Sequence, residues 1–295
     1  MSLRVECVLD IRARLGECPV WCRRSNSLYW IDIHAPSLNR FDPSTGENRV
    51  WMLPEPIGSF ALSNDRSTAL VALKSGLSRF DLESAVLTPL VAPEPDLPHN
   101  RMNDGRCDRQ GRFWVGSMRD PPDPAAPTGT LYRFDPSGRL TPMVGGLYVS
   151  NGLAFSPAGR TIYHSDSFPA VRAIWAWDLD VASGAIANRR LYVDTHGMPG
   201  RPDGGAVDAD GCYWSAATDG WELVRFTPAG VVDRRIALPV SKPSMLAFGG
   251  ERLDTIYVTS IRPANVDLSN QPLAGSLFAV EGAGIAGLPE PLFAG

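Results

Sequence analysis

The sequence predicts an all-β fold, a six-bladed β-propeller, because one order of three strand-like phrases recurs six times along the chain. Each repeat opens with a polar or small residue followed by an apolar stretch, continues with a second β-rich phrase after a turn, and ends on an aromatic anchor. No segment keeps the apolar spacing of a helix for long. A propeller has no internal boundary, so residues 1–295 are expected to form a single domain.

The aromatic anchors mark the third phrase of each repeat. These phrases are LNRFD, LSRFD, LYRFD, IWAWD, LVRFT and SLFAV, with anchors at Phe41, Phe80, Phe134, Trp177, Phe226 and Phe278. The anchors recur at intervals of 39 to 54 residues, which suits one four-stranded blade. Two β-sandwiches of about 150 residues each are the alternative for many short strands, but sandwiches would not repeat one phrase order six times.

The remaining phrases complete the blades. The second phrases are SNSLYWID, DRSTALVAL, QGRFWVGS, AGRTIYHSD, DGCYWSAA and LDTIYVTS, and the first are GECPVW, GSFALS, NDGRCD, NGLAFS, DGGAVD and PSMLAF. We expect the first phrases to form the innermost strands. Residues 5–11 are expected to close the ring as an outer strand beside residues 290–293. The insertions 120–129 and 262–275 contain Pro and polar residues, which predicts surface loops near a mouth of the channel.

Composition limits the partners and the compartment. The formal net charge is -4 with interspersed signs, so nucleic acid and membrane partners are not expected. The first residues lack an apolar secretory signal core, and the five cysteines have no disulfide spacing, which favours the cytoplasm. Cys18 and Cys22 could be half of a zinc site, but no second Cys or His pair lies nearby in the sequence. Without a long exposed apolar run, a monomer is the expectation.

Polar residues at the start of the first phrases are the candidates for chemistry, since innermost strands line the channel. This slot holds Glu17, Ser59, Asn103 with Asp104, Asn151, Asp203 and Ser244. Oxygen ligands that converge from separate strands suit a hard or borderline divalent cation such as Ca²⁺, Mg²⁺ or Mn²⁺. The alternative interpretation is that these short polar residues only cap turns and solvate the channel. Their shared slot favours a metal site.

Two charged residues near the same level could contact a substrate. Arg101 lies two residues before Asn103, and Asp120 follows the strand phrase FWVGSM. A guanidinium offers paired donors to polyol or carbonyl oxygens. The four histidines are scattered, and the chain has no G-x-S-x-G nucleophile elbow, phosphate loop or dinucleotide fingerprint. Hydrolysis by a metal-activated water is the chemistry that fits what remains.

Together these phrases resemble a known family. LGECPVW, NRMNDGRCD, GRFWVGSM, SNGLAFS, PDGGAVD and QPLAGSLFAV are similar, in order and spacing, to the senescence marker protein 30, gluconolactonase and luciferin-regenerating enzyme family. The resemblance implies one divalent metal ion, of Ca, Zn, Mn, Mg or Fe, held by Glu17, Asn151 and Asp203. It implies substrate contacts at Arg101, Asn103 and Asp120, the last often Glu in the family.

The reaction that the resemblance implies is hydrolysis of an aldonic-acid lactone to the free sugar acid. We hypothesise that the metal ion polarises the lactone and that Asp203 accepts a proton from the attacking water. Two alternatives stay open: a calcium-dependent phosphotriesterase of the diisopropylfluorophosphatase type, and a non-catalytic propeller that binds calcium or serves as an interaction platform. The loops 120–129, 164–170 and 196–201 are expected to decide the substrate.

Overall fold

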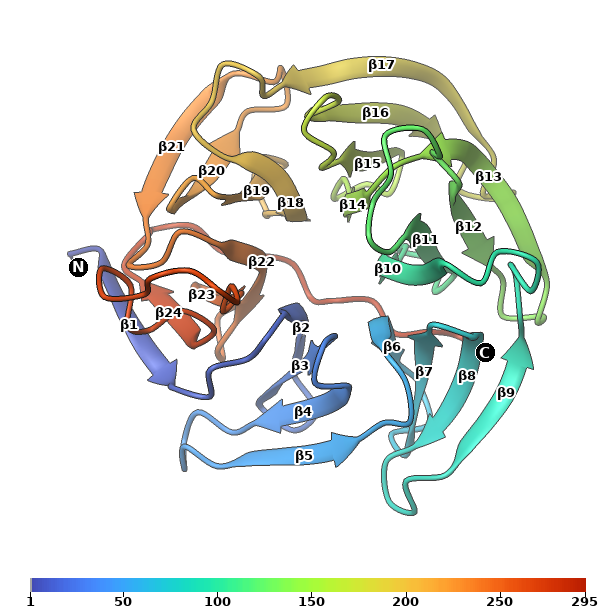
Figure 1. Cartoon of the computed structure of the whole chain (residues 1–295), viewed down its shortest axis with the longest axis horizontal. Coiled ribbons are helices and arrows are strands. Elements are labelled where there is room, and N and C mark those ends of the chain that lie inside the picture. The colour runs from blue at the N-terminus through green and yellow to red at the C-terminus, as the bar shows by residue number, and fades with distance from the viewer. Residues whose placement is uncertain (1) are drawn as a thin grey trace.

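Residues 2–295 are described by a computed structural model, in which six four-stranded antiparallel sheets are arranged as blades around one central axis (Figure 1). Blades one to three contain β2 (Gly16–Cys22), β3 (Ser27–Asp32), β4 (Ser37–Phe41), β5 (Asn48–Met52); β6 (Ile57–Leu62), β7 (Thr68–Leu73), β8 (Gly76–Asp81), β9 (Leu87–Val91); and β10 (Asn100–Cys107), β11 (Phe113–Arg119), β12 (Gly129–Phe134), β13 (Leu140–Leu147). Blades four to six contain β14 (Ser150–Phe155), β15 (Thr161–Asp166), β16 (Ala173–Leu179), β17 (Ile186–Asp194); β18 (Arg201–Val207), β19 (Tyr213–Thr218), β20 (Glu222–Phe226), β21 (Val232–Ala237); and β22 (Pro243–Gly249), β23 (Thr255–Ser260), β24 (Leu277–Glu281), β1 (Arg4–Leu9).

The predicted phrase order is confirmed strand by strand. The first phrases form the innermost strands β2, β6, β10, β14, β18 and β22, which surround the axis in Figure 1. The six aromatic anchors lie on the third strands and are at most 5% exposed. They pack between blades, where flat sheets of short strands must bury their faces against one another. We call the face where the inner strands begin the site face.

The ring is closed by β1, but not against the predicted partner. β1 pairs antiparallel with β24, in a register that places Val5 opposite Val280. The prediction that residues 290–293 form this partner was wrong. That segment follows Pro289 and contains Pro291, neither of which can donate a ladder hydrogen bond, whereas β24 offers an unpaired edge. Residues 290–293 instead cross the face opposite the site, where Phe293 bridges to Ser63 of blade two.

Buried acids at that opposite face tie together strands of the same blade. Asp108 accepts hydrogen bonds from Arg112 Nε at 2.6 Å and Trp114 Nε1 at 3.0 Å. Asp208 repeats this arrangement in blade five, with Trp214 Nε1 and Arg225 Nε each at 2.8 Å. Both carboxylates are fully buried and fully partnered. Their role is therefore structural, in contrast to the acids at the axis.

Both insertions are loops on the site face. Residues 120–128 join β11 to β12, beginning beside Arg101, and residues 261–276 join β23 to β24. The second loop is tied to the segment before β2 by hydrogen bonds from Ala13 N to Gly275 O (2.8 Å) and from Arg262 N to Ala13 O (3.1 Å). All five cysteines are free thiols. Within residues 2–295, no helix has the length and apolar character to cross a membrane.

Candidate active site

A bulge in the inner strand of every blade shapes the slot at the axis. The pairing between the first two strands shifts at Glu17, near Ser59, between Met102 and Gly105, after Asn151, after Pro202 and after Pro243. A bulge adds an unpaired residue and redirects the neighbouring side chains. The same local irregularity thus occurs six times, at the position where the sequence predicts the slot.

Unusual backbone follows two of the predicted metal ligands. Gly152 follows Asn151 with φ 64°, and Cys18 follows Glu17 with φ 47°. A Cβ on Gly152 would lie 2.5 Å from both Ser165 Oγ and Tyr213 Oη, so this position requires glycine. Cys18 adopts the left-handed conformation with a side chain, at a cost that functional sites often carry. The backbone on both strands is therefore bent where the ligand side chains project.

Carboxylates are concentrated in this slot. Burial raises the pKa of Glu17 well above its ordinary value, and the nearby charges of Asp203 and Asp104 raise it further. Burial likewise raises the pKa of Asp203 to about 7 and that of Asp104 to about 6. Glu17, Asn151 and Asp203 are 8%, 4% and 6% exposed. Buried acids that oppose one another's ionisation are the setting in which a bound cation is favoured.

The predicted ligand set contains two carboxylates and one carboxamide. Among the described residues, no group of three or more His, Cys, Asp or Glu side chains is placed to hold a metal ion. A site built from Glu17, Asn151 and Asp203 has only two such side chains, and its third donor is the amide oxygen of Asn151. Carboxylate and amide oxygens are the donor chemistry of hard divalent cations, so these residues fit such an ion.

Arg101, Asn103 and Asn151 form one chain of hydrogen bonds. Arg101 Nη1 donates to Asn103 Oδ1 at 2.6 Å, and Asn103 Nδ2 donates to Asn151 Oδ1 at 3.0 Å and to Ser150 O at 2.8 Å. Arg101 is only 5% exposed. The two predicted substrate residues are thus physically connected to a predicted metal ligand, although they come from neighbouring blades.

Asp120 lies at the rim of the same chain. Its Oδ2 accepts from Arg101 Nε at 2.6 Å and lies 3.9 Å from His34 Nε2. The His34 and Arg101 side chains hold the pKa of Asp120 well below its ordinary value, so it is an anion. Its side chain is 34% exposed, which leaves one edge open to a ligand. The shorter acid still reaches Arg101.

Sequence reasoning missed Ser167 and His34 and left Asp104 without a role. Asn151 Nδ2 donates to Ser167 Oγ at 2.7 Å, and that hydroxyl donates to Pro202 O, so Ser167 links blades four and five. Asp104 Oδ2 accepts from Leu153 N at 2.8 Å, while its Oδ1 has no partner among the described residues. Ser167 stands just after its strand phrase, and nothing in one sequence distinguishes it from a turn serine.

The expected specificity loop 164–170 begins later than expected. His164, Ser165 and Asp166 belong to β15, and residues 167–172 form the loop. His164 is fully buried, with Nε2 2.8 Å from Ser150 Oγ, and burial lowers its pKa to about 3. It is therefore a neutral residue inside blade four. Loop 195–200 lies on the site face, where Arg172 Nη2 donates to three of its carbonyls.

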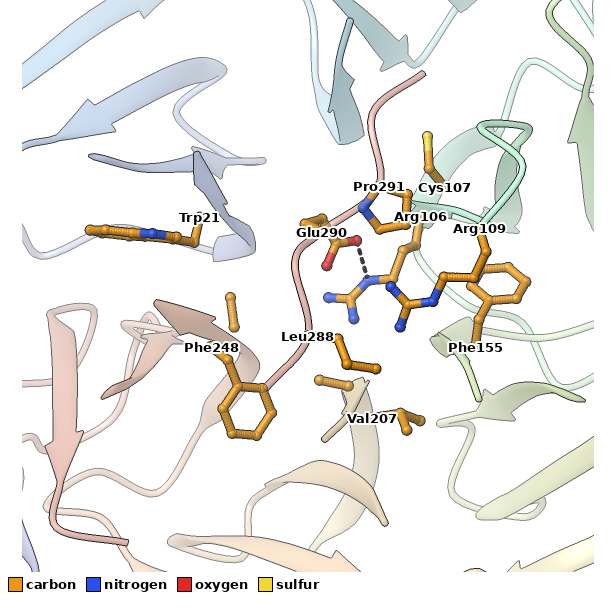
Figure 2. A pocket seen from close by; sticks show the side chains of 12 residues that line it. Trp21, Arg106, Cys107, Arg109, Phe155, Val207, Phe248, Leu288, Glu290 and Pro291 are labelled. Atoms are coloured by element: carbon orange, nitrogen blue, oxygen red, sulfur yellow. Dashed lines mark ion pairs between the residues drawn. The ribbon is translucent and has the colours of Figure 1, made fainter. Parts of the chain in front are cut away.

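The opposite end of the axis is covered by the C-terminal tail. Figure 2 shows this pocket, which Leu288, Glu290 and Pro291 cross. Arg106 Nε and Glu290 Oε1 form an ion pair at 3.2 Å there. The volume of the cavity is about 20 Å³, which is enough for one water molecule. A substrate would therefore approach the predicted ligands from the site face.

Comparisons with known proteins identify relatives of this chain and the family to which it belongs. The chain is 42% identical over 298 residues to 6-deoxy-6-sulfogluconolactonase of Pseudomonas putida, and the alignment covers 100% of both chains. It is 37% identical over 289 residues to L-arabinolactonase of Azospirillum brasilense, covering 97% of this chain and 94% of the relative. A solved calcium-binding protein, regucalcin of Agrobacterium tumefaciens, superposes with a TM-score of 0.93 at 28% identity, covering 99% and 97% of the chains. A profile of the SMP-30/Gluconolactonase/LRE-like region matches residues 15–262, and the chain therefore belongs to this family.

Proposed function

We propose that this chain is a sugar-acid lactonase that hydrolyses the lactone of an aldonic acid with one divalent metal ion held by Glu17, Asn151 and Asp203. The observation that supports it most is the buried pair of carboxylates, Glu17 of blade one and Asp203 of blade five, in which burial and then the charge of Asp203 raise the pKa of Glu17. Relatives similar over the full chain are named as lactonases of sugar acids. A structural relative is described as binding calcium. The metal could be Ca, Zn, Mn, Mg or Fe.

A bound cation would polarise the lactone carbonyl and stabilise negative charge on its oxygen. The neighbouring groups fit that arrangement. Asn151 is fixed by hydrogen bonds to Asn103 and Ser167, so its amide orientation is determined before any ligand arrives. Asp104 adds a further negative charge beneath the ligands. The site is thus pre-organised for a cation.

Asp203 is the proposed general base. A water oxygen attacks the carbonyl carbon while one water proton passes to an Asp203 carboxylate oxygen. The ring C–O bond then breaks, and Asp203 passes this proton to the leaving alkoxide, which becomes the sugar hydroxyl, while the new carboxylic acid ionises to solvent. Without a cation, burial raises the pKa of Asp203 to about 7, close to the value at which a base works near neutral pH. A cation would lower this pKa and hold the carboxylate ionised.

Arg101, Asn103 and Asp120 are proposed to orient the sugar ring. Arg101 keeps guanidinium donors beyond those used toward Asp120 and Asn103, since five N–H groups are available. The anionic Asp120 can accept a hydrogen bond from a sugar hydroxyl at its exposed edge. Such contacts position the lactone carbonyl near Asp203 and lower the entropy lost on reaching the transition state.

The test is hydrolysis of a panel of aldonolactones by chelated protein, followed by pH-indicator absorbance, with and without added Mn, Zn, Ca or Fe ions. Metal-dependent turnover of any lactone is the expected result. If every lactone stays intact while metal still binds, the proposal is refuted. A phosphotriester in the same assay tests the diisopropylfluorophosphatase-like alternative. Hydrolysis of neither the lactones nor the phosphotriester would indicate a non-catalytic calcium-binding propeller.

Replacing Arg101 by Gln is expected to raise KM about tenfold or more, because a charge-assisted contact to substrate is lost. The kcat should fall less, since the proposed base and ligands remain. Steady-state kinetics on the best lactone measure both. The matched control is Arg190→Gln, an exposed Arg on the outer edge of blade four that pairs with Asp178 and Asn188 there. An unchanged KM in the Arg101 variant would remove this residue from the substrate contacts.

A further inference from the structure

A second group of charges lies on the site face at blades five and six, whereas Arg101 and Asp120 belong to blade three. Arg201 begins β18 two residues before Asp203, Asp219 follows β19, and Lys242 precedes β22. Arg201 Nη2 donates to Asp219 Oδ2 at 2.7 Å, and the Lys242 ammonium contacts Asp219 Oδ1. We call these three residues the blade five rim cluster. They stand where the strand ends of blades five and six meet the site.

The rim cluster is connected to the predicted ligands. Arg201 Nη1 donates to Ser167 O at 3.1 Å, and Ser167 Oγ receives the Asn151 amide at 2.7 Å. Arg201 also lies two residues before Asp203 on the same strand, β18. A ligand seated over Asn151 and Asp203 would therefore extend toward the rim cluster on one side and toward Arg101 on the other.

The two sides differ in charge. On one side a single cation, Arg101, is matched by a single anion, Asp120. On the other side two cations, Arg201 and Lys242, share one carboxylate, Asp219. Among the three residues of the rim cluster itself, one positive charge is therefore left over.

The rim cluster also has hydrogen-bond donors to spare. An ammonium has three N–H groups, and Lys242 uses one. Arg201 has five N–H groups and uses its Nε and one on each Nη. The Arg201 and Lys242 side chains are 28% and 24% exposed, so both are partly desolvated and still accessible. Charge-assisted donors in this setting favour a sulfonate or carboxylate over a hydroxyl.

We propose that Arg201 and Lys242 form an anion subsite, and that the preferred substrates are lactones with a sulfonate or carboxylate on the terminal carbon of the sugar. This inference rests on the proposed lactonase function. It assigns the neutral hydroxyl contacts to the Arg101 side and the anionic end of the substrate to the rim cluster.

The experiment compares kcat/KM for gluconolactone, its 6-deoxy-6-sulfo analogue and the analogue with a C6 carboxylate, using metal-loaded protein. We expect at least a tenfold preference for an anionic lactone, roughly what one charge-assisted contact contributes. Arg201→Gln and Lys242→Gln should each lower the ratio of anionic to neutral kcat/KM about tenfold. Arg201→Lys and Lys242→Arg, which keep the charge, should recover part of it. Arg190→Gln is the control that leaves the ratio unchanged.

The three lactones and the variants distinguish failure of the subsite from failure of the proposed function. Turnover of gluconolactone with no preference for either anionic analogue overturns the subsite and leaves the lactonase proposal intact. Equal losses on all three lactones in the Gln variants overturn it too, because they indicate a general effect on the site. Turnover of none of these three by a protein that hydrolyses another aldonolactone overturns the subsite alone, and no turnover of any aldonolactone refutes the proposed function as well. The anionic analogue with the higher kcat/KM shows whether sulfonate or carboxylate is the preferred ligand.

Discussion

Replacing Asp203 by Asn is expected to lower kcat by about a thousandfold or more, the upper part of the range that a general base contributes. Asn keeps the size of the side chain but can neither accept the proton from water nor offer a carboxylate charge to a cation. Asp203 is 6% exposed, and burial raises its pKa to about 7, so water cannot replace it easily. The loss should be seen on every lactone that the wild-type protein hydrolyses.

Metal content distinguishes the two roles proposed for Asp203. Elemental analysis of the purified variant, followed by assay at saturating metal, shows whether lost binding or a lost base limits turnover. Asp178→Asn is the matched control, since this exposed acid on β16 pairs with Arg190 far from the axis. Wild-type turnover by Asp203→Asn with a full complement of metal would eliminate the residue as the base.

Divalent metal is expected to raise the thermal midpoint of the chelated protein by about 5–10 °C at a hundredfold excess over Kd, since ligand linkage then contributes about 2.7 kcal/mol. The gain should grow with pH. The pKa of Asp203 is raised from its ordinary 3.8 to about 7, and that of Glu17 is raised in the same direction. Folded protein then holds these protons more tightly than unfolded protein does. Their stabilising contribution is complete below about pH 4 and disappears as pH rises through 7.

The metal-free protein should therefore be less stable at pH 8 than at pH 5 on account of these two acids, and a cation should reverse this trend by replacing the protons. Differential scanning fluorimetry across this range, with and without each ion, measures the effect. Asp203→Asn should lose most of the metal-induced shift, and Asp178→Asn should retain it. A shift that is independent of pH, or intact in the Asp203 variant, would contradict binding at these acids.

Repetition made the fold predictable from the sequence. Six aromatic anchors, from Phe41 to Phe278, are buried between blades. Because each blade supplies one anchor to this packing, the anchors recur at a regular interval in the sequence. The same period identified the slot that holds Glu17, Asn151 and Asp203, because the first strand of each repeat always faces the axis. Periodic patterns report a shared environment, and the shared environment here is the centre of the ring.

Features that break the period were decided by the tertiary structure. The partner of β1 depended on which edge remained unpaired, and the Pro-containing tail went across the opposite face instead. Ser167 acquired its contact with Asn151, and His34 its place beside Asp120, only because loops from different blades meet on the site face. The unequal charge of the Arg101 and Arg201 sides also depends on residues distant in sequence, Asp219 and Lys242 among them. The sequence by itself determined the repeating backbone and the residue types at the axis, since these follow from local strand and turn preferences repeated six times. The network around them required the closed ring, because hydrogen bonds and ion pairs depend on distances that exist only after the blades have packed.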